Sequence, residues 1–100
     1  MTDDFSLLLD RIRILVERPA DEPGTGPEFV ELTLTDGYAR ALALEAERRR
    51  AEGRVRELAG DADALAEQRV LKARLERIDE ELAELRGLLD LLAATLKTPV

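Results

Sequence analysis

The sequence predicts an all-α protein made of a long antiparallel helical hairpin, coiled-coil-like, preceded by a short amphipathic helix. Three observations support this fold class. Charged residues make up 37% of the chain and aromatic residues 3%, a composition typical of long helices. Apolar residues recur at heptad spacing in two long segments. A Gly-Asp pair separates these segments, and the second apolar pattern is one residue out of phase with the first.

Residues 1–18 form the first predicted element, an amphipathic helix. Thr2 or Asp3 can cap its N-terminus, and Arg18 lies in its last turn, where a cation favours the helix dipole. Its apolar residues follow the i, i+3, i+4, i+7 pattern of one helical face: Phe5, Leu8, Leu9, Ile12, Leu15 and Val16. A strand over residues 11–17 is the alternative, because apolar residues also alternate there.

Residues 19–27 are predicted to be a linker, because they hold three of the four prolines and two of the six glycines. The following residues 29–35 are ambiguous. They alternate and are rich in β-branched side chains, which fits a strand. Pro27 and Glu28, however, are typical of the first turn of a helix. The helix is favoured, because an arm that begins near Pro27 matches the length of the second arm.

The predicted hairpin occupies residues 28–100, and its two arms share one apolar seam. The second arm shows an unbroken 4-3-4-3 spacing, and in the first arm Gly37 and Arg48 also fall on seam positions. We call these apolar residues the hairpin seam: Leu34, Leu44, Val55, Leu58, Leu65, Leu71, Leu75, Ile78, Leu82, Leu85, Leu89 and Leu92.

A turn near residues 60–61 accounts for the phase slip between the two patterns. Folding there pairs positions whose numbers add up to about 122–123, so that Gly37 faces Leu85 and Leu34 faces Leu89. A single helix would have to absorb the slip as a bend, and that broken rod is the alternative.

The turn carries two aspartates, Asp61 and Asp63. Gly60 can end the first arm in a left-handed conformation, and either aspartate can cap the second arm. The sequence Asp61-Ala62-Asp63-Ala64 at a hairpin tip also resembles the secondary-channel regulators of bacterial RNA polymerase. That resemblance implies tip carboxylates that act beside a catalytic magnesium ion. The best-known motif of the group is D-x-x-D-x-A, from which D-A-D-A departs.

The arginine-rich stretch from Arg48 to Arg56 admits two interpretations. Its cations could bind a phosphate-bearing ligand. Interleaved glutamates instead predict a solvated face with ion pairs within the helix, namely Glu45–Arg49, Glu47–Arg50, Glu52–Arg56 and Arg54–Glu57. Arg48, on the seam, and Gln68 are candidate polar seam residues, which can fix register and partner choice.

Apolar residues outside the seam predict an interaction surface, because a two-helix hairpin buries only the seam itself. The candidate partner or oligomer surface comprises Phe5, Leu8, Leu9, Ile12, Leu32, Leu42, Leu88 and Leu91. The N-terminal helix or a second copy of the chain could cover the hairpin residues of this set. We therefore expect a homo-oligomer, namely a dimer.

The composition excludes several functions. The chain has no cysteine and no histidine, which removes thiolates, disulfides and the commonest catalytic base and metal ligand. We expect no catalytic site, metal or cofactor, and interpret the acidic cluster Asp79–Glu81 with Glu84 as a solvated face. The net charge of −7 argues against nucleic-acid binding. No apolar run could span a bilayer and no signal peptide is evident, so a cytoplasmic location is expected.

These observations predict a non-catalytic coiled-coil interaction or scaffold module that self-associates and docks a protein partner through helical faces, as an adaptor does. The alternative is a transcription regulator that binds RNA polymerase or a sigma factor through the hairpin or its acidic tip.

Overall fold

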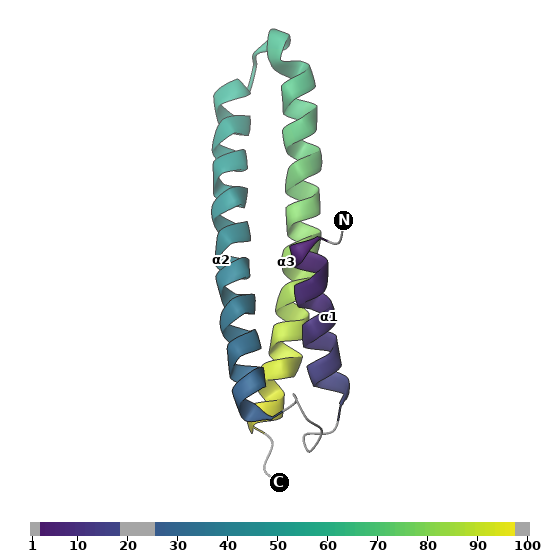
Figure 1. The fold of residues 1–100 in the computed structure, drawn as a ribbon. Coiled ribbons are helices and arrows are strands. Elements are labelled where there is room, and N and C mark those ends of the chain that lie inside the picture. The colour runs from purple at the N-terminus through teal and green to yellow at the C-terminus, as the bar shows by residue number, and fades with distance from the viewer. Residues whose placement is uncertain (1–2, 19–25, 98–100) are drawn as a thin grey trace.

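The computed structural model describes residues 3–18 and 26–97, and in these residues every regular element is helical (Figure 1). The elements are α1 (Asp4–Glu17), α2 (Pro27–Leu58), the short 3-10 helix η1 (Ala62–Ala64) and α3 (Leu65–Lys97). Helices α2 and α3 run antiparallel, and α1 packs against both at the end away from the turn. The predicted all-α helical hairpin is confirmed. The strand alternatives for residues 11–17 and 29–35 are wrong, since both segments are helical.

Helix α1 begins where a side chain can satisfy its first backbone donor. The Asp3 carboxylate accepts a hydrogen bond from the Phe5 N–H at 3.3 Å. After Glu17 the backbone becomes extended at Arg18. Within α1 the buried residues are those of one apolar face, Phe5, Leu9, Ile12 and Leu15. The predicted linker, residues 19–27, lies outside the described residues except for Gly26 and Pro27, and Pro27 is already helical.

Helix α2 begins at Pro27 because proline has no N–H to leave unsatisfied in a first helical turn and its φ suits a helix. The buried residues Val30, Thr33, Leu34 and Gly37 follow at helical intervals. This helical spacing puts the apolar residues on one face of α2, and that face packs against α1 and α3. The segment 29–35 is therefore helical despite its alternating pattern.

The turn between α2 and α3 depends on Gly60, whose φ of 82° lies in the left-handed region that favours glycine. The Asp61 side chain then caps η1 by accepting a hydrogen bond from the Asp63 N–H at 3.0 Å. Backbone bonds from Ala59 to Arg56 and from Asp61 to Leu58 close the end of α2. The chain therefore reverses within residues 59–61.

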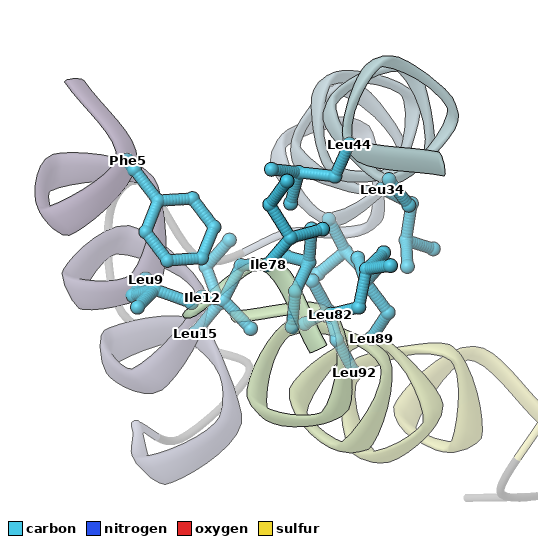
Figure 2. Packing of buried hydrophobic residues seen from close by; sticks show 13 residues of the cluster. Phe5, Leu9, Ile12, Leu15, Leu34, Leu44, Ile78, Leu82, Leu89 and Leu92 are labelled. Atoms are coloured by element: carbon cyan, nitrogen blue, oxygen red, sulfur yellow. The ribbon is translucent and has the colours of Figure 1, made fainter. Parts of the chain in front are cut away.

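One apolar cluster joins all three helices at the end where α1 packs, which we call the three-helix end (Figure 2). From α1 and α2 it contains Phe5, Leu9, Ile12, Leu15, Val30, Leu34, Ala41 and Leu44, and from α3 it contains Ile78, Leu82, Leu85, Leu89 and Leu92. Burying one such leucine or isoleucine contributes about 1.5–3 kcal/mol. Hydrophobic burial therefore stabilises the fold mainly at the three-helix end.

Beyond the three-helix end, only α2 and α3 face each other, and the seam is less well covered. Val55, Leu71 and Leu75 are half-buried, whereas Leu58 is buried. A second helix covers only one side of each seam residue, so partial exposure follows from the absence of a third helix among the described residues. We call this half of the hairpin the turn end.

The prediction that Leu65 belongs to the seam is wrong, because its side chain is exposed. The 3-10 turn η1 precedes it, and the layer nearest the turn is closed by a polar side chain instead. Gln68 donates from Nε2 to the Leu58 carbonyl at the end of α2, and it also approaches the Asp61 carbonyl at 3.3 Å. The seam therefore ends at the level of Gln68.

At Gly37, the packing of α2 against α3 leaves no room for a side chain. A Cβ built on Gly37 would lie 2.3 Å from Leu89 Cδ2, which is far inside van der Waals contact. The predicted register placed Leu85 opposite Gly37, one seam position earlier. Side chains on a helix lean toward its N-terminus, so Leu89 reaches back to cover this position.

We predict that Gly37→Ala destabilises the protein, although alanine is the better helix former. The new methyl group must displace Leu89, which is buried, and overpacking of this kind costs about 1–3 kcal/mol. Over most of this range the cost exceeds the helix-propensity gain of about 1 kcal/mol. Urea denaturation followed by circular dichroism measures the change in the free energy of unfolding.

Gly53→Ala is the matched control, because Gly53 lies in the same helix and a Cβ there would have no neighbour within 4 Å. We expect this variant to gain up to about 1 kcal/mol. If both alanine variants shift stability in the same direction, the close approach at Gly37 is not what limits that position.

Candidate functional site

The three-helix end keeps apolar side chains on its outside even after α1 has packed. In α2, Leu32 is 64% exposed and Leu42 is 66% exposed. Other large apolar residues with substantial exposure at this end are Leu7, Ile14, Phe29, Tyr38, Leu91 and Leu96. Single exposed apolar residues are ordinary, whereas several on neighbouring turns of one helix suggest an interaction site.

The exposed residues of α2 form a second heptad-spaced row, which we call the outer stripe. Its members are separated by 3, 4, 3 and 4 residues and are Leu32, Thr35, Ala39, Leu42 and Ala46. Leu32, Ala39 and Ala46 each follow a core residue of α2 by two positions, which rotates them about 200° around the helix. The outer stripe therefore lies on the side of α2 that is opposite the core, and only Ala46 in it is half-buried.

Part of the predicted partner surface is instead core. Phe5, Leu9 and Ile12 are buried between α1, α2 and α3, where Figure 2 shows their side chains directed toward the hairpin. Leu8 and Leu88 are partly buried against the same cluster. Helix α1 thus covers one flank of the hairpin, and the buried Phe5, Leu9 and Ile12 are not available to a partner. Leu32, Leu42 and Leu91 remain exposed as predicted.

Ion pairs hold α1 on both sides. Arg11 pairs with Asp36 of α2, and Arg13 pairs with Glu84 of α3. All four side chains are about half exposed, so each pair contributes little, at most about 1 kcal/mol. Arg40 adds a cation–π contact over the Phe5 ring, 5.5 Å from its centroid. These contacts fix the orientation of α1, while its apolar face supplies most of the attachment.

Among the described residues, charged side chains beside the seam form four ion pairs between α2 and α3, and two further pairs form within α2. Glu47 bonds Arg74 at 2.7 Å, Arg54 bonds Glu67 at 2.9 Å, and Arg86 pairs with Glu45. Among the helical pairs predicted from spacing, Arg54–Glu57 forms at 3.1 Å, whereas Glu45, Glu47 and Glu52 choose other partners. Residues that flank a seam face the neighbouring helix, which explains why Glu45 and Glu47 pair with α3, whereas Glu52 pairs with Arg48 within α2.

Arg48 is not a buried seam residue, contrary to its place in the heptad pattern. Its side chain is half exposed and bonds Asp79 of α3 at 2.7 Å and Glu52 at 3.3 Å. The long arginine stem lets the guanidinium leave the seam and reach water. Gln68 is half-buried and caps the carbonyl end of α2. Both polar residues therefore bridge the two arms.

The groove beside Arg48 is a poor phosphate site. It is lined by Arg48, Arg49 and Arg86 together with Glu45 and Asp79. Two of these arginines already pair with the two carboxylates, so an anion would have to displace them. At the turn end, hydrogen bonds to Glu67 and Glu57 raise the pKa of Arg54 above its usual value.

The tip carboxylates are exposed, and one of them is engaged. Asp61 caps η1, while the Asp63 side chain is exposed. Within the described part of the chain, no group of three or more acidic, cysteine or histidine residues could hold a metal ion. In that same part, no helix has a stretch long and apolar enough to cross a membrane.

Comparisons of this chain with protein-family models, with curated proteins and with solved structures find no match.

Proposed function

We propose that this protein is a non-catalytic interaction module that self-associates and docks a protein partner through the outer faces of its three-helix end. The observation that carries the proposal is the exposure of Leu32 and Leu42 on α2. Fully burying a leucine contributes about 1.5–3 kcal/mol, so covering both would provide a substantial driving force.

The distribution of contacts along the molecule supports this assignment. At the turn end, charged side chains bridge the two arms and apolar exposure is confined to Leu65 and Val70 among the large residues described. The three-helix end combines a buried core with an apolar exterior, which is how proteins present a preformed docking face. The alternative of a regulator that acts through its tip has less support, because Asp61 is engaged as a helix cap.

The test replaces both exposed leucines. We predict that the double variant Leu32→Asp/Leu42→Asp loses self-association but keeps its helical content and cooperative unfolding, because neither side chain belongs to the core. Sedimentation equilibrium at several protein concentrations measures the association. The tip variant Asp61→Asn/Asp63→Asn is expected to associate as the original chain does.

Val70→Asp is the matched control, since Val70 is 68% exposed on α3 at the turn end. It should leave the association unchanged. An original chain that sediments as a monomer at every concentration, or a Val70 variant that dissociates as readily as the leucine variant, would refute self-association through the three-helix end.

A further inference from the structure

We propose that the outer stripe of α2 pairs with the outer stripe of a second copy in an antiparallel arrangement, with Ala39 next to the two-fold axis. This rests on the self-association proposed above and specifies its partner face, orientation and register. Around such an axis, residues whose numbers add up to about 78–80 lie opposite each other, and each contact occurs twice.

The size of the stripe residues suits this register. Ala39 meets its own copy at the axis, where two small side chains let the helices approach closely. Leu32 lies opposite Ala46, so a large residue faces a small one at either end of the stripe. On one flank, the exposed Tyr38 lies opposite the exposed Leu42. The same antiparallel register that pairs Leu32 with Ala46 therefore also covers Tyr38 and Leu42.

Charge complementarity selects the antiparallel orientation. Helix α2 is acidic near its start and basic farther along, with Glu28 and Glu31 before the stripe and Arg49 and Arg50 after it. Glu31 and Arg49 are eighteen residues apart, which is about five turns at 3.6 residues per turn, so they project from the same flank. Antiparallel pairing places Glu31 of one copy opposite Arg49 of the other, and Glu28 opposite Arg50. A parallel pair would stack like charges.

These four residues are available for a partner. Within residues 3–18 and 26–97, the side chains of Glu28, Glu31, Arg49 and Arg50 make no ion pair, although most of the neighbouring charges on α2 do. Leu7 of α1 lines one groove with Ala39, so a second copy also covers apolar surface beside the stripe.

Single cysteines test the register, because the chain contains none of its own. Ala39→Cys should form a disulfide-linked dimer on mild oxidation, since the two copies meet at the axis. Ala46→Cys is the matched control from the same stripe. Its two copies would lie about 14 residues apart along the helix axis, roughly 20 Å, which is far beyond the Cα separation of about 7 Å that a disulfide permits.

Charge reversal tests the orientation without cysteines. Glu31→Arg and Arg49→Glu should each weaken dimerisation by roughly tenfold at low salt, because each substitution creates two repulsive contacts. The double variant Glu31→Arg/Arg49→Glu should recover most of the affinity. Circular dichroism melting of each variant, at a concentration where it is monomeric, separates effects on folding from effects on association.

The outcomes distinguish this inference from the proposed function. A dimer in which Ala46→Cys links as readily as Ala39→Cys is parallel. A dimer in which neither cysteine links, or in which the double charge reversal restores nothing, uses another face or register. Each of these results overturns the antiparallel pairing and leaves self-association standing. A chain that is monomeric at every concentration overturns both.

Discussion

Leu85→Ala is expected to lower the free energy of unfolding by about 2–5 kcal/mol, the range for deleting a leucine side chain from a packed core. Leu85 is 0% exposed and lies in the cluster that joins α1, α2 and α3. A small domain has a total stability of about 5–15 kcal/mol, so the variant loses a large part of what it has. Urea denaturation measured by circular dichroism gives the difference.

Leu91→Ala provides the control for this experiment. Leu91 lies six residues farther along the same helix and is 56% exposed. Both variants remove the same atoms at sites of similar backbone geometry, so the difference between them isolates burial. We expect Leu91→Ala to change stability by no more than about 0.5 kcal/mol. Equal losses at the two positions would mean that Leu85 is not in the core.

The contrast between Leu85 and Leu91 also shows what the sequence can predict. Heptad spacing records which residues of a helix share a face, and the seam of α3 follows from that alone. The core positions Ile78, Leu82, Leu85 and Leu89 are buried as their spacing suggests. Spacing also indicates the turn, because the phase slip between the two heptad patterns falls near Gly60, whose φ is left-handed.

The placement of α1 could not be predicted, because the segment between it and the hairpin carries no information on where it packs. Its apolar face could equally have met a second copy of the chain. The structure places that face on the hairpin, so Phe5, Leu9 and Ile12 are core residues rather than a partner surface. Which flank α1 occupies depends on side-chain fit and on partners such as Asp36 and Glu84.

Arg48 and Leu65 depart from their predicted seam positions for a different reason. A heptad pattern treats Arg48 as a seam position, but its long side chain reaches Asp79 outside the seam. Leu65 fits the extrapolated pattern of the first arm, yet η1 interrupts the helix before that residue. A heptad pattern assumes that the helix is continuous and that each side chain stays on the face of its own Cα. The first assumption fails at Leu65 and the second at Arg48.

Ile12→Ala should detach α1 from the hairpin rather than unfold the whole molecule. Ile12 is 0% exposed and is the most deeply buried residue of α1, so its truncation costs about 2–5 kcal/mol of packing. The exposed pairs Arg11–Asp36 and Arg13–Glu84 contribute too little to compensate. We therefore expect a large rise in the fraction of molecules with α1 undocked.

Hydrogen exchange locates this loss. Backbone amides of α1 should exchange much faster in Ile12→Ala, whereas the amides of α2 and α3 near Leu44 and Ile78 should keep most of their protection, since the hairpin retains its seam. Ile14→Ala is the control, because Ile14 lies two residues away on the same helix and is 45% exposed. Loss of protection throughout the chain would show that α1 and the hairpin unfold as one unit, and unchanged protection in α1 would show that its apolar face does not hold it in place.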